Sequence, residues 1–230
     1  MIKAILLDFN GVLIDDEPIQ MRAYQEILEK EGITLTEADY YSCLGMDDAS
    51  FVAAAYDRAG KAPAPNKILE VTQAKTEKWR ESIAGRIPLF DGVENFVRKM
   101  ANDFTLGIVS MASREEIEHV LETSGMADKF SVIVCAGEAR KPKPDPECYR
   151  IGFRKIDSAR TSGGHLPMTH GECLVIEDSP AGVIAARSAD LPTLGVTNTV
   201  GAEELRAAGA NQIAADLNDW MPHSVRRVFV

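Results

Sequence analysis

The sequence lacks several features that mark particular classes of protein. Its four cysteines have neither the CxxC spacing of many metal and redox sites nor the density of a disulfide framework. No apolar run approaches the length that spans a membrane, and there is no internal repeat or low-complexity tail. Acidic residues outnumber basic ones, giving a formal net charge of -10, which argues against a surface for nucleic acid. We therefore expect a globular protein of the reducing cytoplasm that binds neither membrane nor nucleic acid.

The first apolar segment, residues 2–7, is expected to form a strand. It is short, has no helical period, and ends at Asp8 before a turn at Asn10-Gly11. Such a run suits a strand that is buried on both faces of a parallel sheet. Ligands of open α/β sheets bind just beyond the carboxyl ends of the strands. Asp8 therefore stands where chemistry would occur, although an ordinary strand-ending turn would also place an acid and Asn-Gly here.

A helical block is expected to follow from residue 16 to residue 87. Acidic residues and Pro18 suit the first turn of a helix that ends near Gly32. Thr36 is a candidate N-cap, Asp47 or Asp48 could begin a later helix, and a longer helix is expected over residues 67–83. The block is too large for a crossover connection. We interpret it as an inserted helical domain.

From Pro88 onward, helical and strand patterns alternate, which predicts a right-handed, mostly parallel α/β sheet. Residues 157–171 are the most irregular segment and are expected to form a flexible surface loop. The predicted division is an α/β core of residues 1–15 and 88–230 around a helical domain of residues 16–87. Strands are expected at 104–110, 130–135, 173–176 and 192–196, and helices at 93–100, 113–125, 145–153 and 179–188.

Polar residues recur where the later strands end. Ser110 follows one apolar run, Glu177 and Asp178 follow another, and residues 140–146 carry lysines between prolines. If these groups meet Asp8 at one edge of the sheet, the set contains a carboxylate, a hydroxyl, an ammonium and a pair of acids. Oxygen ligands of this kind hold Mg²⁺. The combination suits phosphoryl transfer, with charge on the phosphoryl oxygens neutralised and a carboxylate attacking in line.

In order and spacing these motifs resemble those of the haloacid dehalogenase (HAD) superfamily. The resemblance covers essentially the whole chain and is greatest for the branch that contains β-phosphoglucomutase and phosphoglycolate phosphatase-like enzymes. Residues 179–183 and 196–199 also fit that branch. It implies a Rossmann-like core with a helical cap over the nucleophile, and Mg²⁺-dependent hydrolysis of a small phosphorylated metabolite. A monomer or a small homo-oligomer is expected.

The resemblance assigns a role to each residue that matches a motif. Asp8 resembles the nucleophile that forms an aspartyl-phosphate. The metal ligands would be Asp8, Asp178 and the backbone carbonyl of Asn10, with Glu177 either a ligand or a support for one. The alternative for Glu177 and Asp178 is an ordinary acid-rich helix start.

The remaining assignments concern the phosphate and the rest of the substrate. Ser110 resembles the hydroxyl that grips the phosphoryl group, and Lys141 the lysine that orders nucleophile and phosphate, although a solvated lysine is the alternative. Gly45 and Met46 lie in a loop that resembles the substrate-selecting loop of the cap, with a plain helix–loop junction as the alternative. Arg114 is a candidate for binding substrate phosphate, with a helix-surface role as the alternative.

One residue departs from the family pattern in a way that bears on activity. The family usually has a second aspartate two residues after the nucleophile, and here the position is Asn10. An amide can neither protonate a leaving alkoxide nor activate water. Because general acid–base catalysis contributes about 10²–10⁴-fold, we expect reduced phosphatase activity. The alternatives are an impaired phosphometabolite-binding protein or a variant that traps the intermediate. Phosphomutase and phosphonatase activities are minor alternatives, because Met46-Asp47-Asp48 follows Gly45 where those relatives carry arginine or lysine.

Overall fold

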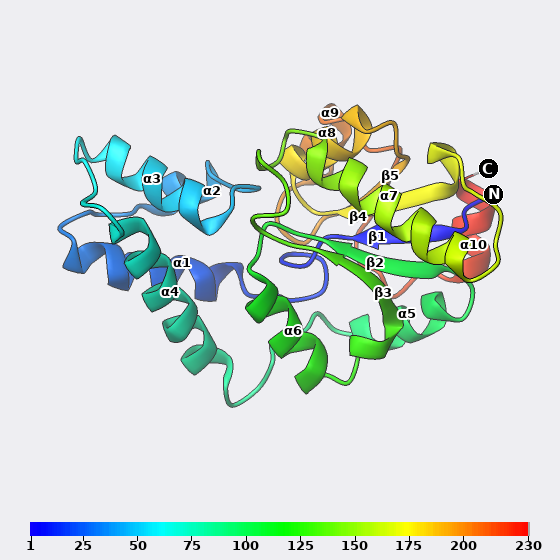
Figure 1. The fold of residues 1–230 in the computed structure, drawn as a ribbon, viewed down its shortest axis with the longest axis horizontal. Coiled ribbons are helices and arrows are strands. Elements are labelled where there is room, and N and C mark those ends of the chain that lie inside the picture. The colour runs from blue at the N-terminus through cyan, green and yellow to red at the C-terminus, as the bar shows by residue number, and fades with distance from the viewer. Residues whose placement is uncertain (230) are drawn as a thin grey trace.

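A six-stranded parallel sheet forms the centre of the larger part of the molecule (Figure 1). The computed structural model describes residues 1–229. The strands lie in the order β3-β2-β1-β4-β5-β6, and every neighbouring pair is parallel. The predicted Rossmann-like α/β fold is therefore confirmed. The strands are β1 (Ala4–Leu7), β2 (Thr105–Val109), β3 (Phe130–Val134), β4 (Cys173–Glu177), β5 (Thr193–Val196) and β6 (Gln212–Ala214).

Alternate residues of the central strands enter two apolar layers, one on each face of the sheet. Ile5 and Leu7 of β1 belong to the larger cluster, whereas Ala4 and Leu6 belong to the smaller one. This is the burial expected of a strand whose side chains point to opposite faces. The larger cluster includes residues of α5 (Val93–Ala101), α6 (Arg114–Thr123) and α10 (Pro222–Val228), and the smaller one those of α7 (Glu147–Ser162) and α8 (Pro180–Ser188).

The shorter elements complete this part of the chain. Helix α9 (Ala202–Ala207) packs against β5, β6 and α8. Two single turns of 3₁₀-helix, Ala127–Lys129 and His170–Glu172, lead into β3 and β4. No helix within residues 1–229 is both long enough and apolar enough to cross a lipid bilayer.

Four helices between β1 and α5 lie apart from the sheet, beyond the carboxyl end of β1 (Figure 1). They surround an apolar cluster of their own, which includes Tyr24, Phe51 and Val71. The C-terminal turns of the last helix leave this cluster, because Trp79 and Ile83 are buried in the larger cluster of the sheet. The helical block therefore makes an apolar contact with the core at one end. Its helices are α1 (Glu17–Lys30), α2 (Glu37–Tyr41), α3 (Asp48–Arg58) and α4 (Lys67–Ile83).

Local sequence signals located most helix starts, and one predicted loop is wrong. Thr36 caps α2 as expected, and of the two candidates for α3 it is Asp47 that caps the helix; each side chain accepts a backbone hydrogen bond from its helix. The expected loop at 157–171 begins too early, because α7 continues to Ser162. Arg160 fixes these last turns to the sheet by donating to the carbonyl of Lys3 at 3.2 Å. The two residues are 157 positions apart in the sequence, so no local sequence pattern indicates this contact.

Candidate active site

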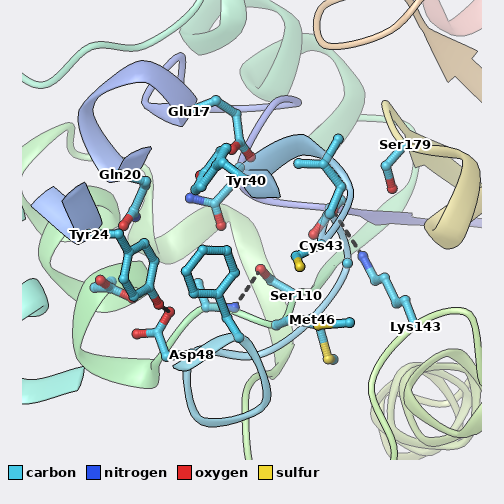
Figure 2. A pocket seen from close by; sticks show the side chains of 18 of the residues that line it. Glu17, Gln20, Tyr24, Tyr40, Cys43, Met46, Asp48, Ser110, Lys143 and Ser179 are labelled. Atoms are coloured by element: carbon cyan, nitrogen blue, oxygen red, sulfur yellow. Dashed lines mark hydrogen bonds and ion pairs between the residues drawn. The ribbon is translucent and has the colours of Figure 1, made fainter. Parts of the chain in front are cut away.

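Adjacent strands bring the predicted site residues to one edge of the sheet. Asp8 follows β1 and Ser110 follows β2, while Glu177 ends β4 and precedes Asp178. Because β1 lies between β2 and β4, these side chains meet at the carboxyl ends of three neighbouring strands. Asp8, Ser110 and Asp178 line a cavity. Side chains of the helical block, such as Tyr24 and Tyr40, line it as well (Figure 2).

The lysine at this site is Lys143, and the expectation for Lys141 is corrected. The Nζ of Lys143 lies 2.9 Å from Asp8 Oδ2 and 2.5 Å from Glu177 Oε1, and 1% of the side chain is exposed. The Lys141 side chain is 75% exposed and approaches only Asp145, at 3.9 Å. Both lysines precede a proline in the Lys-Pro-Lys-Pro repeat. The local pattern is therefore the same for both, and only the path of the folded loop selects between them.

Burial and mutual charge set the electrostatics around Lys143. Burial raises the pKa of Asp8 to about 7, against the attraction of Lys143 and with a contribution from Glu177. Burial alone would lower the pKa of Lys143, but Asp8 and Glu177 raise it above its ordinary value. Burial, then Glu177 and Asp8, also raise the pKa of Asp178 well above its usual range. Asp8, Glu177 and Asp178 thus bring together more buried carboxylate than the Lys143 ammonium neutralises.

The donor set fits a hard divalent cation. One oxygen from each of Asp8, Glu177 and Asp178 lies within 4.8 Å of the other two. Both oxygens of Glu177 are already engaged, because they accept hydrogen bonds from Lys143, Tyr149 and Ser179. Glu177 is therefore better suited to hold Lys143 than to bind a metal, while Asp8 and Asp178 remain the carboxylates available to Mg²⁺.

Gly11 allows the loop after β1, residues 8–13, to approach Asp178. Its φ of +72° is in the left-handed region, and a Cβ atom there would lie 1.8 Å from Asp178 Oδ2. The loop is fixed from β5's side, where Asn198 Nδ2 donates to the Gly11 carbonyl at 2.8 Å and Thr199 donates to Asp178. Only glycine meets both the conformational and the steric requirement.

The Asn10 side chain is turned toward a buried carboxylate that the sequence did not single out. Its Nδ2 donates to both oxygens of Asp16, at 3.0 and 3.1 Å. Asp16 also accepts from Gln20 at 3.0 Å and from Trp79 at 2.7 Å. Burial raises the pKa of Asp16 to about 6, although these donors oppose the shift. In the sequence Asp16 reads as an ordinary acid before a helix, so no local signal distinguished it.

The side of the cavity that faces the helical block carries the predicted loop and a charged cluster. Gly45 and Met46 line the cavity, and a Cβ at Gly45 would lie 3.2 Å from Lys143 Cβ, so the loop touches the core directly. The Lys75 ammonium lies 2.7 Å from Asp48 and 2.9 Å from Glu116 of α6. This ion-pair cluster therefore connects the helical block to the core across the cavity.

Arg114 lies outside the site, and the expectation that it binds substrate phosphate is corrected. Its guanidinium pairs with Glu118 at 3.2 Å and Glu138 at 3.0 Å, and 47% of the side chain is exposed. It is the first residue of α6 after the Ser113 cap. The pairing with two acids on the outer surface favours the helix-surface role.

Comparison with models of protein families shows to which family the chain belongs. Residues 5–196 match the model of the haloacid dehalogenase-like hydrolases. The chain belongs to this family. The family prediction is confirmed, and with it the prediction of a hydrolase. This range contains the helical block together with Asp8, Glu177 and Asp178.

Curated HAD relatives resemble the chain over most of its length. The chain is 28% identical over 97% of its length to validoxylamine A 7'-phosphate phosphatase of Streptomyces hygroscopicus, covering 98% of that protein. It is 26% identical over 90% of its length to phosphorylated carbohydrates phosphatase of Thermotoga maritima, covering 92%. It is also 28% identical over 95% of its length to the chloroplastic protein SUPPRESSOR OF QUENCHING 1 of Arabidopsis thaliana, of which it spans 20%.

Solved structures share the fold of this chain over nearly its whole length. A β-phosphoglucomutase of Clostridium difficile superposes with a TM-score of 0.85 at 23% identity, covering 100% of this chain and 97% of that one. CbbY of Rhodobacter sphaeroides, in an aspartate-to-asparagine variant bound to xylulose-1,5-bisphosphate, superposes with a TM-score of 0.79 at 25% identity, covering 95% of this chain and 96% of that one. The first of these similarities concerns the fold alone.

Proposed function

We propose that this HAD hydrolase is a Mg²⁺-dependent phosphatase of small phosphate monoesters, with Asp8 as nucleophile. The observation that carries the proposal is the meeting of Asp8, Ser110, Lys143 and Asp178 in one cavity. A carboxylate nucleophile beside an ammonium and a hydroxyl suits attack on phosphorus. Relatives named as phosphatases support the same class of substrate.

The residues of the site have distinct tasks in this reaction. An oxygen of Asp8 attacks phosphorus, while Lys143 holds the Asp8 carboxylate and neutralises charge on the phosphoryl oxygens. Ser110 Oγ accepts a hydrogen bond from the backbone N–H of Ala112 at 3.1 Å, so its own proton is free to bind a phosphoryl oxygen. Mg²⁺ held by Asp8, Asp178 and the Asn10 carbonyl would supply further neutralisation of phosphoryl charge.

The substrate we propose has one phosphate and a neutral or cationic remainder. On the cap side the cavity is lined by the carboxylates of Glu17, Asp48 and Glu116, with Lys75 as the cation among them. This excess of negative charge would repel a second phosphate. The helical block would act as a cap that excludes water while the phosphoryl group is transferred. We propose the cytoplasm as the location, since all four cysteines are free and buried.

A binding function is the second candidate, and Asn10 is the observation that favours it. The amide replaces the family's usual acid, and it is held by Asp16. A protein that bound phosphometabolites, or that stopped at the aspartyl-phosphate, would need the same nucleophile loop and lysine. Slow turnover distinguishes the phosphatase from this alternative.

The proposal is tested by phosphate release from a panel of sugar, amino-sugar and small-acid monophosphates, with and without Mg²⁺. The parent, Asp8→Ala and Asn10→Asp are compared with the swapped double variant Asn10→Asp/Asp16→Asn. The swap retains one amide and one carboxylate in the pair while moving the acid to residue 10. We expect Mg²⁺-dependent release by the parent that Asp8→Ala abolishes, and faster release by the swapped variant.

Two results would decide against the phosphatase. Substrate binding without release by the parent, together with release by the swapped variant, would favour the binding protein. Equal release by the parent and Asp8→Ala would show that Asp8 is not the nucleophile.

A further inference from the structure

One carboxylate of the cavity has no task in the reaction described above. The carboxylates that line it belong to Asp8, Glu17, Asp48, Glu116 and Asp178. Asp8 and Asp178 form the nucleophile and metal site, and Asp48 and Glu116 are paired with Lys75. Among residues 1–229, Glu17 has no salt-bridge partner.

Glu17 is placed at the junction of cap and core. It is the first residue of α1, directly after the stretch that leaves the nucleophile loop, and its carboxyl faces the cavity beside Tyr40 (Figure 2). The Tyr40 hydroxyl donates to Glu17 Oε2 at 2.5 Å. Oε1 accepts no hydrogen bond from the described part of the chain. One oxygen is therefore held in place while the other remains available to a bound molecule.

Asp16 is nearer to Asn10 but is poorly placed to exchange protons with a substrate. Both of its oxygens accept hydrogen bonds, from Asn10, Gln20 and Trp79. It is fully buried and does not line the cavity. Its donors stabilise the anion, whereas Glu17 has one donor and a free oxygen.

The surroundings of Glu17 also favour a carboxyl that changes protonation near neutral pH. Burial raises the pKa of Glu17 to about 7, with Asp16 and Asp8 adding to the rise, and with Tyr40 and Lys75 opposing it. The negative charge of Glu17 in turn contributes to the raised pKa values of Asp178 and Tyr41. A group with a pKa near the working pH is suited to give up a proton in one step and accept one in the next.

We propose that Glu17 is the general acid and base that Asn10 cannot be. As Asp8 Oδ attacks phosphorus, the bond from phosphorus to the leaving oxygen breaks, and Glu17 gives its proton to that oxygen, which leaves as an alcohol. Glu17, now a carboxylate, then accepts a proton from water as the water oxygen attacks the aspartyl-phosphate. The bond from phosphorus to Asp8 breaks, phosphate leaves, and Glu17 is protonated again. The inference rests on the proposed phosphatase function and names a further catalytic residue for it.

Leaving-group dependence provides a test that a merely structural role would not satisfy. A sugar alkoxide needs a proton to leave, whereas 2,4-dinitrophenolate does not. We therefore compare parent and Glu17→Gln in single-turnover and burst experiments with a sugar phosphate and with 2,4-dinitrophenyl phosphate. For Glu17→Gln we expect a burst of dinitrophenol near parental rate followed by turnover slowed about 10²–10⁴-fold. First turnover of the sugar phosphate should be slowed by the same order.

Glu37→Gln is the matched control, because it makes the same change at an exposed position of the cap. Circular dichroism and the thermal midpoint establish that both variants are folded. As a second measurement, Tyr40→Phe removes the hydrogen-bond donor that lowers the pKa of Glu17. The single-turnover rate of this variant on the sugar phosphate should therefore decline at a higher pH than that of the parent.

The outcomes separate this inference from the proposed function. Equal slowing of both substrates in the first turnover, or no slowing of either by Glu17→Gln, would overturn the role of Glu17 while leaving Asp8-dependent hydrolysis intact. No release and no aspartyl-phosphate in the parent with either substrate would instead remove the phosphatase on which the inference rests.

Discussion

A single lysine determines how the charges of the site balance. Lys143 lies between Asp8 and Glu177 and is almost completely buried. It is also 5.2 Å from the ring centroid of Tyr149, whose hydroxyl donates to the same Glu177. The ammonium therefore serves two carboxylates in a setting where water cannot replace it.

Lys143→Gln should abolish phosphate release and lower the free energy of unfolding, whereas Lys141→Gln should leave both unchanged. The first substitution leaves two buried carboxylates without a cation, and breaking a buried pair in this way costs about 3–5 kcal/mol. Urea unfolding gives the free energy of unfolding, and phosphate release gives the activity. Loss of activity in Lys141→Gln alone would show that the exposed lysine moves into the site during turnover.

At the scale of elements, the sequence was sufficient to predict the sheet edge but not the contacts across it. Short apolar runs ending in Asp8, Ser110 and Asp178 predicted parallel strands and a common edge. Nothing local distinguished Lys143 from its neighbour, and the role of Asp16 depends on Trp79, sixty-three positions away in the chain. Residues whose place follows from the local sequence pattern were predictable. Residues whose role depends on a partner far away in the sequence were not.

Gly11→Ala should weaken Mg²⁺ binding far more than it weakens the fold, and Gly60→Ala is its matched control. Both glycines have left-handed φ values, +72° and +66°, but a Cβ at Gly60 would meet nothing within 4 Å. Each substitution should cost about 1–2 kcal/mol of backbone strain. Only at Gly11 would the new methyl displace the Asp178 carboxylate. Calorimetric titration with Mg²⁺ checks the difference, and equal affinities in the two variants would contradict it.

At the scale of the whole molecule, two ion pairs join α4 of the helical block to α6 of the core. Lys75 pairs with Glu116 in a fully buried setting, and Arg80 pairs with Glu115 at 2.7 Å in an exposed one. Glu115 and Glu116 are adjacent in α6 and both pair with α4, but Glu115 is exposed to solvent whereas Glu116 is buried. Because exposed pairs contribute about 0–1 kcal/mol, the contact between the helical block and the core should depend mainly on the buried pair.

Glu116→Gln should shift the helical block away from the core, and Glu115→Gln should not. Glutamine retains an oxygen for the Ser113 cap but loses the charge that attracts Lys75. Hydrogen bonds to charged groups contribute about 1.5–3 kcal/mol, so the ratio of closed to open molecules should fall roughly tenfold or more. Distances between spin labels on α3 and α7 measure that ratio, and equal distance distributions in the two variants would contradict the prediction.

The same pair predicts how stability depends on pH. Burial would raise the pKa of Glu116, but the Lys75 ammonium and its hydrogen bonds hold it below the ordinary value of 4.5. A carboxyl whose pKa is lower in the folded than in the unfolded state stabilises the fold above 4.5 and loses that contribution as the pH falls. The free energy of unfolding of the parent should therefore decline below pH 4.5 more steeply than that of Glu116→Gln, while Glu115→Gln follows the parent. Parallel declines in all three proteins, measured by urea unfolding at each pH, would assign the acid sensitivity to other carboxylates.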